Sequence, residues 1–323
     1  AFSSFETLYI YDLTNFRLVR LFKSSNSLIR TITFSKNREN YIAIANNDYV
    51  IIYDIIANCH VSYIHTPHIL ETMCWTPNDE IVVGFSKNYD TMYFFESKID
   101  LSKPSSLNNI NKELYDPNRE YYSFNIPPTE SNLKNEDKIH KINLLFNNTF
   151  IATSVIINSK AIFVLGCEGN QIVRLDFQDV KFDFFKAGKD VGTIQEIDYD
   201  PFNSSNCLTT WSNGYVILID ISGEKIFEIH RNNTGSALST GIFLSSLPGH
   251  FITGNSQNGI IQVFSSTSLD PIEKVTIGTY GLITMQRCSP KIKTLKDSII
   301  VNFTDGSIII YDFFKRQNTA QIS

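Results

Sequence analysis

Short runs of β-forming residues recur along the chain, and within them apolar residues alternate with polar ones or follow one another directly. Seven of these runs end in a bulky residue and then an acidic or small polar residue. They are LYIYD (8–12), VIIYD (50–54), MYFFE (92–96), IVRLD (172–176), VILID (216–220), IQVFS (261–265) and IIIYD (308–312). Their ends are separated by 42, 42, 80, 44, 45 and 47 positions. Every step except the third therefore has the length of one β-propeller blade, and the third corresponds to a blade with a long insertion.

Residues that form tight turns precede these runs. The pairs are Asn47-Asp48, Tyr89-Asp90, Gly169-Asn170, Asn213-Gly214, Asn258-Gly259 and Asp305-Gly306. Gly, Asn and Asp tolerate the positive φ that a tight hairpin requires, and another β-type segment stands before each turn. Each repeat unit is therefore predicted to contain a central hairpin.

The remaining apolar segments predict the other two strands of each unit. Innermost strands are expected in LIRTITFS, ILETMCWT, KINLLFN, TIQEIDYD, STGIFLS and LITMQRCS. Outermost strands are expected in FRLVRLF, HVSYIH, EYYSFNI, KFDFFKAG, KIFEIHR, IEKVTI and TAQIS. The first unit begins inside its second strand, because AFSSFETLYIYDL aligns with AIANNDYVIIYDI of the next unit.

With this strand order the chain resembles the WD40-repeat family, whose blades end their third strand in Trp-Asp. Tyr11, Tyr53 and Tyr311 stand where that family has Trp, and its Gly-His dipeptide is absent from the expected place. The resemblance implies an all-β fold, a seven-bladed WD40-like β-propeller, as a single domain over residues 1–323. The first blade is expected to be incomplete in this chain, and the third to carry a long insertion.

The insertion covers residues 97–138 and breaks the repeat. It is polar, contains four prolines and few aliphatic residues, and only EYYSFNI (120–126) reads as a strand. Long insertions in rigid scaffolds often carry binding, so a docking loop is one interpretation. A solvent loop without a partner is the other.

Composition and charge narrow the functional classes. The chain is 42% hydrophobic, enough for a packed core, and its 28 Lys and Arg against 33 Asp and Glu give a net charge of −5. A broad basic field for nucleic acid is not expected. No apolar run is long enough to span a bilayer, and the first residues do not read as a signal peptide. Five widely spaced cysteines without a Cys-x-x-Cys pair favour an intracellular location, in the cytoplasm or nucleus.

No metal or cofactor site is predicted. The histidines of CHVSYIHTPH (59–68) fall on an outermost strand and the loop after it, where their side chains need not converge. Cys74, Cys167 and Cys207 stand in strand positions and are interpreted as small core residues.

Catalytic motifs are also absent from the sequence. It contains no Gly-x-Ser-x-Gly, phosphate-binding loop or His-Glu-x-x-His. Acidic pairs such as Asp198 and Asp200 are interpreted as surface charges. Phosphoinositide-binding propellers use a Phe/Leu-Arg-Arg-Gly motif, and no Arg-Arg pair occurs here.

The most favoured function is a non-catalytic scaffold that binds other proteins or peptides within a multiprotein assembly. Three segments also resemble the retinoblastoma-binding-protein-5 family, the propeller subunit of COMPASS-type histone methyltransferase complexes. They are AFSSFETLYIYDLTNFRLVR (1–20), the Thr66-Pro67 turn with HILETMCWTP (68–77), and IGTYG (277–281), where Tyr280 replaces that family's Arg. A lipid- or nucleic-acid-binding propeller and an enzyme built on a propeller remain the alternatives. Small-molecule binding is not expected.

Candidate partner-binding residues stand before innermost strands and in the turns between second and third strands, which lie on the faces of a propeller. They are Asn26, Ser27, His68, Tyr89, Asp90, Asp190, Asn213, Asn258, Tyr280 and Asp305.

Overall fold

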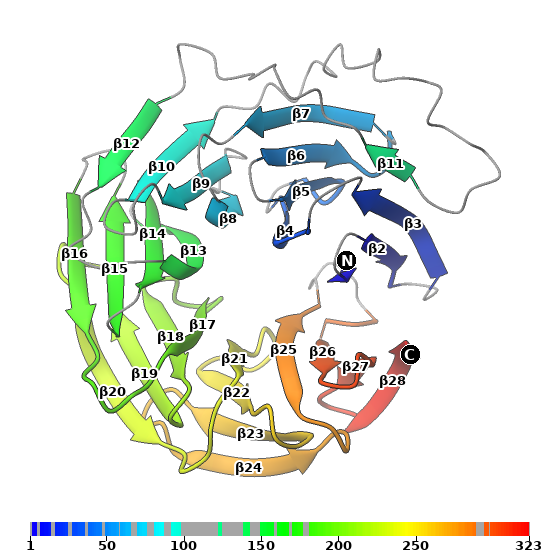
Figure 1. The fold of residues 1–323 in the computed structure, drawn as a ribbon. Coiled ribbons are helices and arrows are strands. Elements are labelled where there is room, and N and C mark those ends of the chain that lie inside the picture. The colour runs from blue at the N-terminus through cyan, green and yellow to red at the C-terminus, as the bar shows by residue number, and fades with distance from the viewer. Residues whose placement is uncertain are drawn as a thin grey trace. The chain divides into compact units, whose positions relative to one another are not determined.

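The computed structural model describes residues 2–4, 7–13, 17–24, 28–35, 38–46, 49–57, 59–65, 70–75, 81–86, 92–97, 122–124, 138–142, 149–157, 160–167, 170–176, 181–288, 294–296 and 298–322. The chain divides into two compact units, unit 1 over residues 1–148 and unit 2 over residues 149–323. Each is described by itself. Every element with described bounds is a β-strand, so the fold is all-β (Figure 1).

Unit 2 consists of four four-stranded antiparallel sheets that follow one another along the chain. Blade A contains β13 (Thr149–Ile157), β14 (Lys160–Cys167), β15 (Gln171–Asp176) and β16 (Lys181–Lys186). Blade B contains β17 (Ile194–Tyr199), β18 (Asn206–Trp211), β19 (Tyr215–Asp220) and β20 (Phe227–Asn233). Blade C contains β21 (Thr240–Phe243), β22 (His250–Gly254), β23 (Ile260–Ser265) and β24 (Pro271–Thr276). Blade D contains β25 (Leu282–Arg287), β26 (Ser298–Phe303), β27 (Ile308–Asp312) and β28 (Gln317–Ile322).

The arrangement of these blades is that of a β-propeller. The first strands of successive blades adjoin, β13 with β17, β17 with β21 and β21 with β25, while the fourth strands lie outermost (Figure 1). The predicted central hairpins of unit 2 are present, and three of their four turns contain a residue with the expected positive φ. Asn170, Gly214 and Gly306 have φ of 62°, 86° and 86°. Local turn chemistry therefore sets where the second strand of each of these blades ends.

Apolar side chains fill the spaces between adjacent blades. Trp211 and Ile194 of blade B pack with Ile172 of blade A. The cluster between blades B and C contains Leu208 of blade B and two rings of blade C, Phe251 and Phe264, which stack with centroids 5.2 Å apart. Both rings are almost fully buried. The cluster between blades C and D includes residues of β22, β23, β25, β26 and β27. Because each cluster draws on two blades, burial of these side chains joins the blades as well as forming their cores.

Side-chain hydrogen bonds to the neighbouring backbone also join the blades. The Arg174 guanidinium of blade A donates to the Ile221 carbonyl of blade B at 3.1 Å. In the other direction, the Ile226 amide of blade B donates to the Asp183 carboxylate at 2.8 Å. The Asn232 amide group of blade B donates to the Leu269 carbonyl of blade C at 2.7 Å.

A β-bulge recurs between the third and fourth strands. In blades B, C and D the outermost strand has one unpaired extra residue, namely Ile229, Ile272 and Thr319. The same irregularity occurs at Val19 and Val61 in unit 1. A bulge bends the strand and increases its twist, so these outermost strands are not flat.

Unit 1 contains three four-stranded sheets. The first has β1 (Phe2–Ser4), β2 (Thr7–Asp12), β3 (Arg17–Ser24) and β11 (Tyr122–Phe124). The second has β4 (Thr31–Phe34), β5 (Tyr41–Ala45), β6 (Tyr49–Asp54) and β7 (Cys59–His65). The third has β8 (Leu70–Trp75), β9 (Ile81–Ser86), β10 (Met92–Ser97) and β12 (Lys138–Ile142).

Two strand assignments around the insertion were wrong. EYYSFNI was expected to be the outermost strand of the third repeat, but β11 pairs in parallel with β3 of the first sheet. KINLLFN was expected to be the innermost strand of the next repeat, but β12 pairs with β10 and completes the third sheet. The innermost position of blade A belongs to β13, whose nine residues offer a longer apolar strand than KINLLFN does. Pairing across about 40 residues of insertion depends on tertiary contacts that local pattern does not encode.

The structure therefore confirms an all-β, propeller-like chain with four complete blades in unit 2. Seven blades in one ring stay a prediction. Within the residues that the structure describes, no helix is long and apolar enough to cross a membrane.

Candidate functional site

Half of the predicted binding residues lie outside the part of the chain that the structure describes. These are Asn26, Ser27, His68, Tyr89 and Asp90. The other half lie in unit 2, in turns at one end of the blades, which we call the entry end because the innermost strands begin there. The opposite end, where the innermost strands finish, is the exit end.

The entry-end turns are fixed by contacts between one another. Asn213, in the turn between β18 and β19, donates from Nδ2 to the carbonyl of Asp190, in the turn before β17, at 2.8 Å. A hydrogen bond from the Tyr215 hydroxyl is the main cause that holds the pKa of the exposed Asp190 carboxyl below its ordinary value. The structure thus brings these two predicted residues together.

The three remaining predicted residues lie in the entry-end turns of blades C and D. The turn of Asn258 is joined to the turn before β25 by the bond from the Ile277 amide to the Gly259 carbonyl, 2.8 Å. Tyr280 follows in that second turn and is 53% exposed. The turn of Asp305 joins it through the bond from the Thr304 amide to the Gly281 carbonyl, 2.8 Å.

Hydrogen bonds within the turns hold the predicted polar side chains. The Asp305 carboxylate accepts from the Ser307 hydroxyl at 2.7 Å and from its amide at 3.0 Å, and both bonds lower the pKa of Asp305. The Asn258 side-chain oxygen accepts from the Ile260 amide at 3.2 Å. These polar side chains are therefore presented in fixed positions rather than as mobile loop residues.

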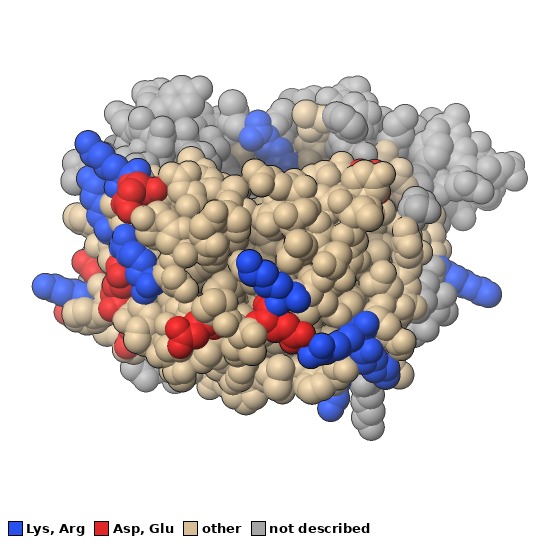
Figure 2. All heavy atoms as spheres, turned by 90° about the horizontal axis from the view of Figure 1, so that it is seen from below, with Lys and Arg blue, Asp and Glu red and all other residues tan. Residues whose placement is uncertain are grey.

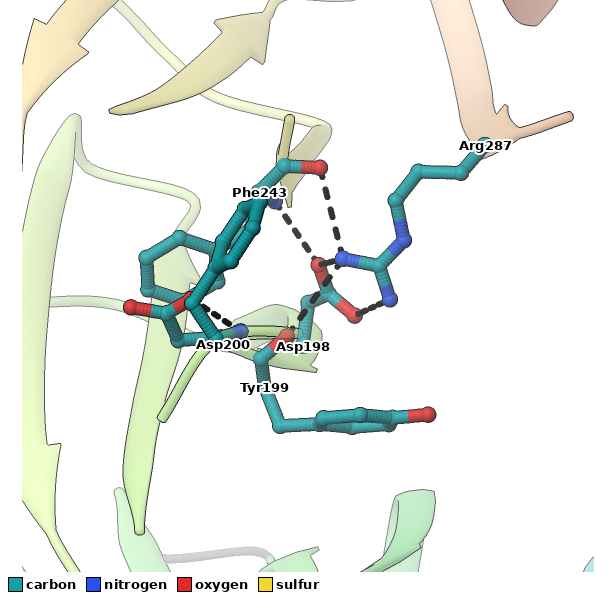
Figure 3. Close-up of polar contacts among 6 residues, drawn as sticks. Asp198, Tyr199, Asp200, Phe243 and Arg287 are labelled. Carbon is teal, nitrogen blue, oxygen red and sulfur yellow. Dashed lines mark hydrogen bonds and ion pairs between the residues drawn. The ribbon is translucent and has the colours of Figure 1, made fainter. Parts of the chain in front are cut away.

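A second cluster, which the sequence reasoning missed, lies at the exit end of the innermost strands (Figure 3). Asp198 of β17 forms a two-point ion pair with Arg287 of β25, with Nη1–Oδ2 and Nη2–Oδ1 distances of 2.6 and 2.8 Å. The Phe243 amide of β21 donates to the same carboxylate at 2.8 Å. Asp198 therefore connects three blades.

The guanidinium of Arg287 is held on several sides. Nη1 also lies 3.3 Å from the carbonyl oxygens of Tyr199 and Phe243. The centre of the guanidinium is 5.5 Å from the centroid of the Tyr199 ring, a cation–π distance. Burial raises the pKa of Asp198, and the positive charge of Arg287 opposes that rise. Two short charge-assisted bonds are the geometry of an ionised pair.

Glu196 forms a second link along the same three innermost strands. Its carboxylate accepts from the Thr240 hydroxyl of β21 at 3.5 Å, and that hydroxyl accepts from the Met285 amide of β25 at 3.1 Å. Burial, with the nearby Asp198 charge, raises the pKa of Glu196 to about 8. Glu196 is therefore mostly protonated at pH 7, and a single negative charge remains beside Arg287.

The interpretation of Asp198 and Asp200 as surface charges was wrong. They are only 8% and 5% exposed, and the Asp200 carboxylate caps the next turn by accepting from the Phe202 amide at 2.8 Å. A signal was present in the sequence. Two segments that otherwise read as innermost strands, TIQEIDYD and LITMQRCS, contain charges of opposite sign, and a buried charge requires a partner.

The described cysteines belong to the packed core. Cys74 and Cys207 are buried, as predicted for core residues, and burial raises the pKa of the Cys207 thiol well above its ordinary value. A thiol in that state is a poor nucleophile. Among the residues with described positions, no three His, Cys, Asp or Glu side chains converge as metal ligands would.

Comparison with known proteins leaves the family open. No protein-family model matches this chain, and no curated protein matches it. The likeness to WD40 repeats accordingly stays a prediction from the sequence, and the structure establishes a propeller-like arrangement without a named family.

Proposed function

We propose that this chain is a non-catalytic, WD40-type propeller of seven blades that holds protein partners within an intracellular assembly. The observation that carries the proposal is the entry end of unit 2. There, exposed side chains such as Tyr280 stand on turns that are bonded to one another across blades. Fixed aromatic and polar side chains lose little conformational entropy on binding, which is what a protein-docking surface requires.

On the one side of the molecule that Figure 2 shows, surface charge supports a protein partner over a nucleic acid or an anionic membrane. Figure 2 shows mostly uncharged surface on the side of the molecule around β24, with separate Lys, Arg, Asp and Glu side chains of both signs. In unit 2, Arg231 pairs with Glu228 and Arg316 with Glu273. Binding to a phosphate backbone needs many unpaired cations on one face.

The polar clusters support a structural role for the buried carboxylates. Asp198 accepts from Arg287 and Phe243, and Asp200 accepts from Phe202, so both act as connectors in the fold. A catalytic carboxylate needs a reacting partner within hydrogen-bond reach rather than a permanent ion pair. An enzyme built on the propeller is therefore the weaker of the two functions.

The test is affinity capture from cells with the tagged full chain and two matched variants. Tyr280→Ala and Phe202→Ala each remove an aromatic side chain that is 53% exposed, the first at the entry end and the second at the exit end. Co-purifying proteins are identified by mass spectrometry, and subunits of histone methyltransferase complexes are the first candidates to look for. Loss with Tyr280→Ala alone supports the proposal. Loss with Phe202→Ala alone keeps the scaffold function and moves its surface to the exit end, whereas absence of any stable partner overturns it.

A further inference from the structure

We infer that Arg287 binds a carboxylate group of a protein partner at the exit end of unit 2. The inference rests on the proposed function and adds the chemistry of a partner. It is based on the observation that Asp198 binds only one edge of the Arg287 guanidinium.

A guanidinium has five N–H donors in a fixed plane. Asp198 takes the end-on edge, because its two oxygens bind Nη1 and Nη2 at 2.6 and 2.8 Å. The other bonds of the group, to the Tyr199 and Phe243 carbonyls, also come from Nη1. Within the described part of the chain, the side-on edge, formed by Nε–H and the outer Nη2–H, donates to no protein atom. Figure 3 shows Nε on the side away from the dashed contacts.

Two other arginines of unit 2 provide comparisons for this arrangement. Glu228 takes the side-on edge of Arg231, with Nε–Oε1 and Nη2–Oε2 distances of 3.1 and 2.7 Å. Arg316 is bound end-on by Glu273, as Arg287 is by Asp198, but its side chain is 65% exposed. The Arg287 side chain is 20% exposed, so it is largely desolvated but keeps some contact with solvent.

The site is also preorganised for a planar anion. Asp198 is itself fixed by the Phe243 amide, so the guanidinium cannot rotate freely, and little side-chain entropy is lost when a ligand binds. The vacant pair of parallel N–H groups matches the spacing of two carboxylate oxygens. The Tyr199 ring beside the guanidinium offers a flat surface for an apolar neighbour of that carboxylate.

Charge selects a carboxylate over a phosphate. The ionised Asp198 already compensates Arg287, and the buried Asp200 lies two residues further along the chain. A dianionic phosphate group carries twice the charge of a carboxylate, so Asp198 and Asp200 would repel it more strongly. The partner group is therefore an Asp or Glu side chain or the end of a polypeptide.

The first test is nuclear magnetic resonance on the full chain with ¹⁵N-labelled arginine, following Nε–H signals. The probes are benzoate, the uncharged benzamide and phenylphosphonate, at constant ionic strength. Arg287→Lys removes the Arg287 signal and so assigns it. Benzoate is expected to shift this signal saturably at concentrations on the order of millimolar, and benzamide to need at least about tenfold more. Arg231, whose side-on edge is filled, serves as the internal control and should not move.

Several results would overturn the inference. These are no saturable shift with benzoate, an equal shift at Arg231, or tighter binding of phenylphosphonate, which would instead indicate a phosphate reader. Tyr199→Leu leaves the ion pair in place and is expected to weaken benzoate about threefold through loss of the ring surface.

The second test links the site to a partner. Arg287→Lys should reduce capture of cellular partners while the remaining arginine signals keep their positions, which shows that the fold is intact. If Arg287→Lys captures the same partners as the parent chain, this inference is wrong and the proposed scaffold function is unaffected. Saturable benzoate binding without any captured partner supports the site and removes the scaffold function instead.

Discussion

Replacement of Glu196 by Gln tests the electrostatics of the innermost strands most directly. The pKa of this carboxyl rises from an ordinary 4.5 to about 8 in the folded chain, mainly through burial. The Glu196 carboxyl therefore binds a proton more tightly in the folded state than in the unfolded state. The contribution of this carboxyl to stability is complete below pH 4.5 and is lost as the pH rises to 8. Gln has the shape of the protonated acid and does not ionise.

The magnitude follows from the pKa difference. At about 1.36 kcal/mol per pH unit, ionisation of Glu196 in the unfolded chain lowers the parent's free energy of unfolding. The loss is about 3 kcal/mol at pH 7 and under about 1 kcal/mol at pH 5. Because Glu196 keeps some contact with solvent, the first figure is an upper bound. Glu196→Gln should therefore match the parent near pH 5 and become more stable by about 1 to 3 kcal/mol at pH 7.

The assay is urea unfolding of the full chain at pH 5, 6, 7 and 8. Tryptophan fluorescence reports on unit 2 through Trp211, which is fully buried there. Glu224→Gln, a change at an exposed turn residue, is the matched control and should alter stability by under about 0.5 kcal/mol at each pH. A gain from Glu196→Gln that stays constant between pH 5 and pH 8 would refute the reasoning, as would a loss that grows with pH.

Further predictions concern packing and backbone geometry, and each is checked by urea unfolding. Arg287→Ala leaves Asp198 buried without its cation and should cost about 2 to 4 kcal/mol, whereas a cost under about 0.5 kcal/mol would mean that the pair is solvated. Phe251→Ala removes a fully buried, stacked ring and should cost about 3 to 5 kcal/mol; a smaller cost would show that blades B and C repack. Gly214 and Gly235 have φ of 86° and 72°, but a Cβ would meet the Ser236 carbonyl at 2.6 Å only at Gly214. Gly214→Ala should therefore cost more than Gly235→Ala, which should cost about 1 kcal/mol, and equal costs would contradict this account.

Most strands of unit 2 could be predicted from the sequence because their signals are local. Alternating apolar residues define the strands, and pairs such as Asn213-Gly214 define the hairpins between them. The errors occur at β11 and β12, whose strand partners are far apart in sequence, and at β13, which was not expected to be a strand. A strand there could pair with the edge of more than one sheet, and tertiary packing decides which edge it joins.

The candidate sites differ in the same way. Exposed turn residues such as Tyr280 could be predicted from their position relative to a strand. The ion pair of Asp198 and Arg287 joins residues 89 positions apart, across blade C, which contributes the backbone amide and carbonyl of Phe243. Sequence pattern could have indicated that each charge needs a partner, but the choice of partner depends on how the innermost strands of blades B and D converge.

The bulges of the outermost strands affect how strongly the protein resists aggregation at high concentration. A strand at the rim of a blade exposes unpaired N–H and C=O groups, and a flat strand of this kind is a template on which another copy can add. The extra residues Ile229, Ile272 and Thr319 bend the rims of three successive blades, so a straight foreign strand cannot stay in register along them. Apolar residues such as Ile272, which is 56% exposed, can thus stand at the rim without starting sheet-to-sheet aggregation. The outer surface can remain inert to other copies of the chain while both ends of the blades stay open to partners.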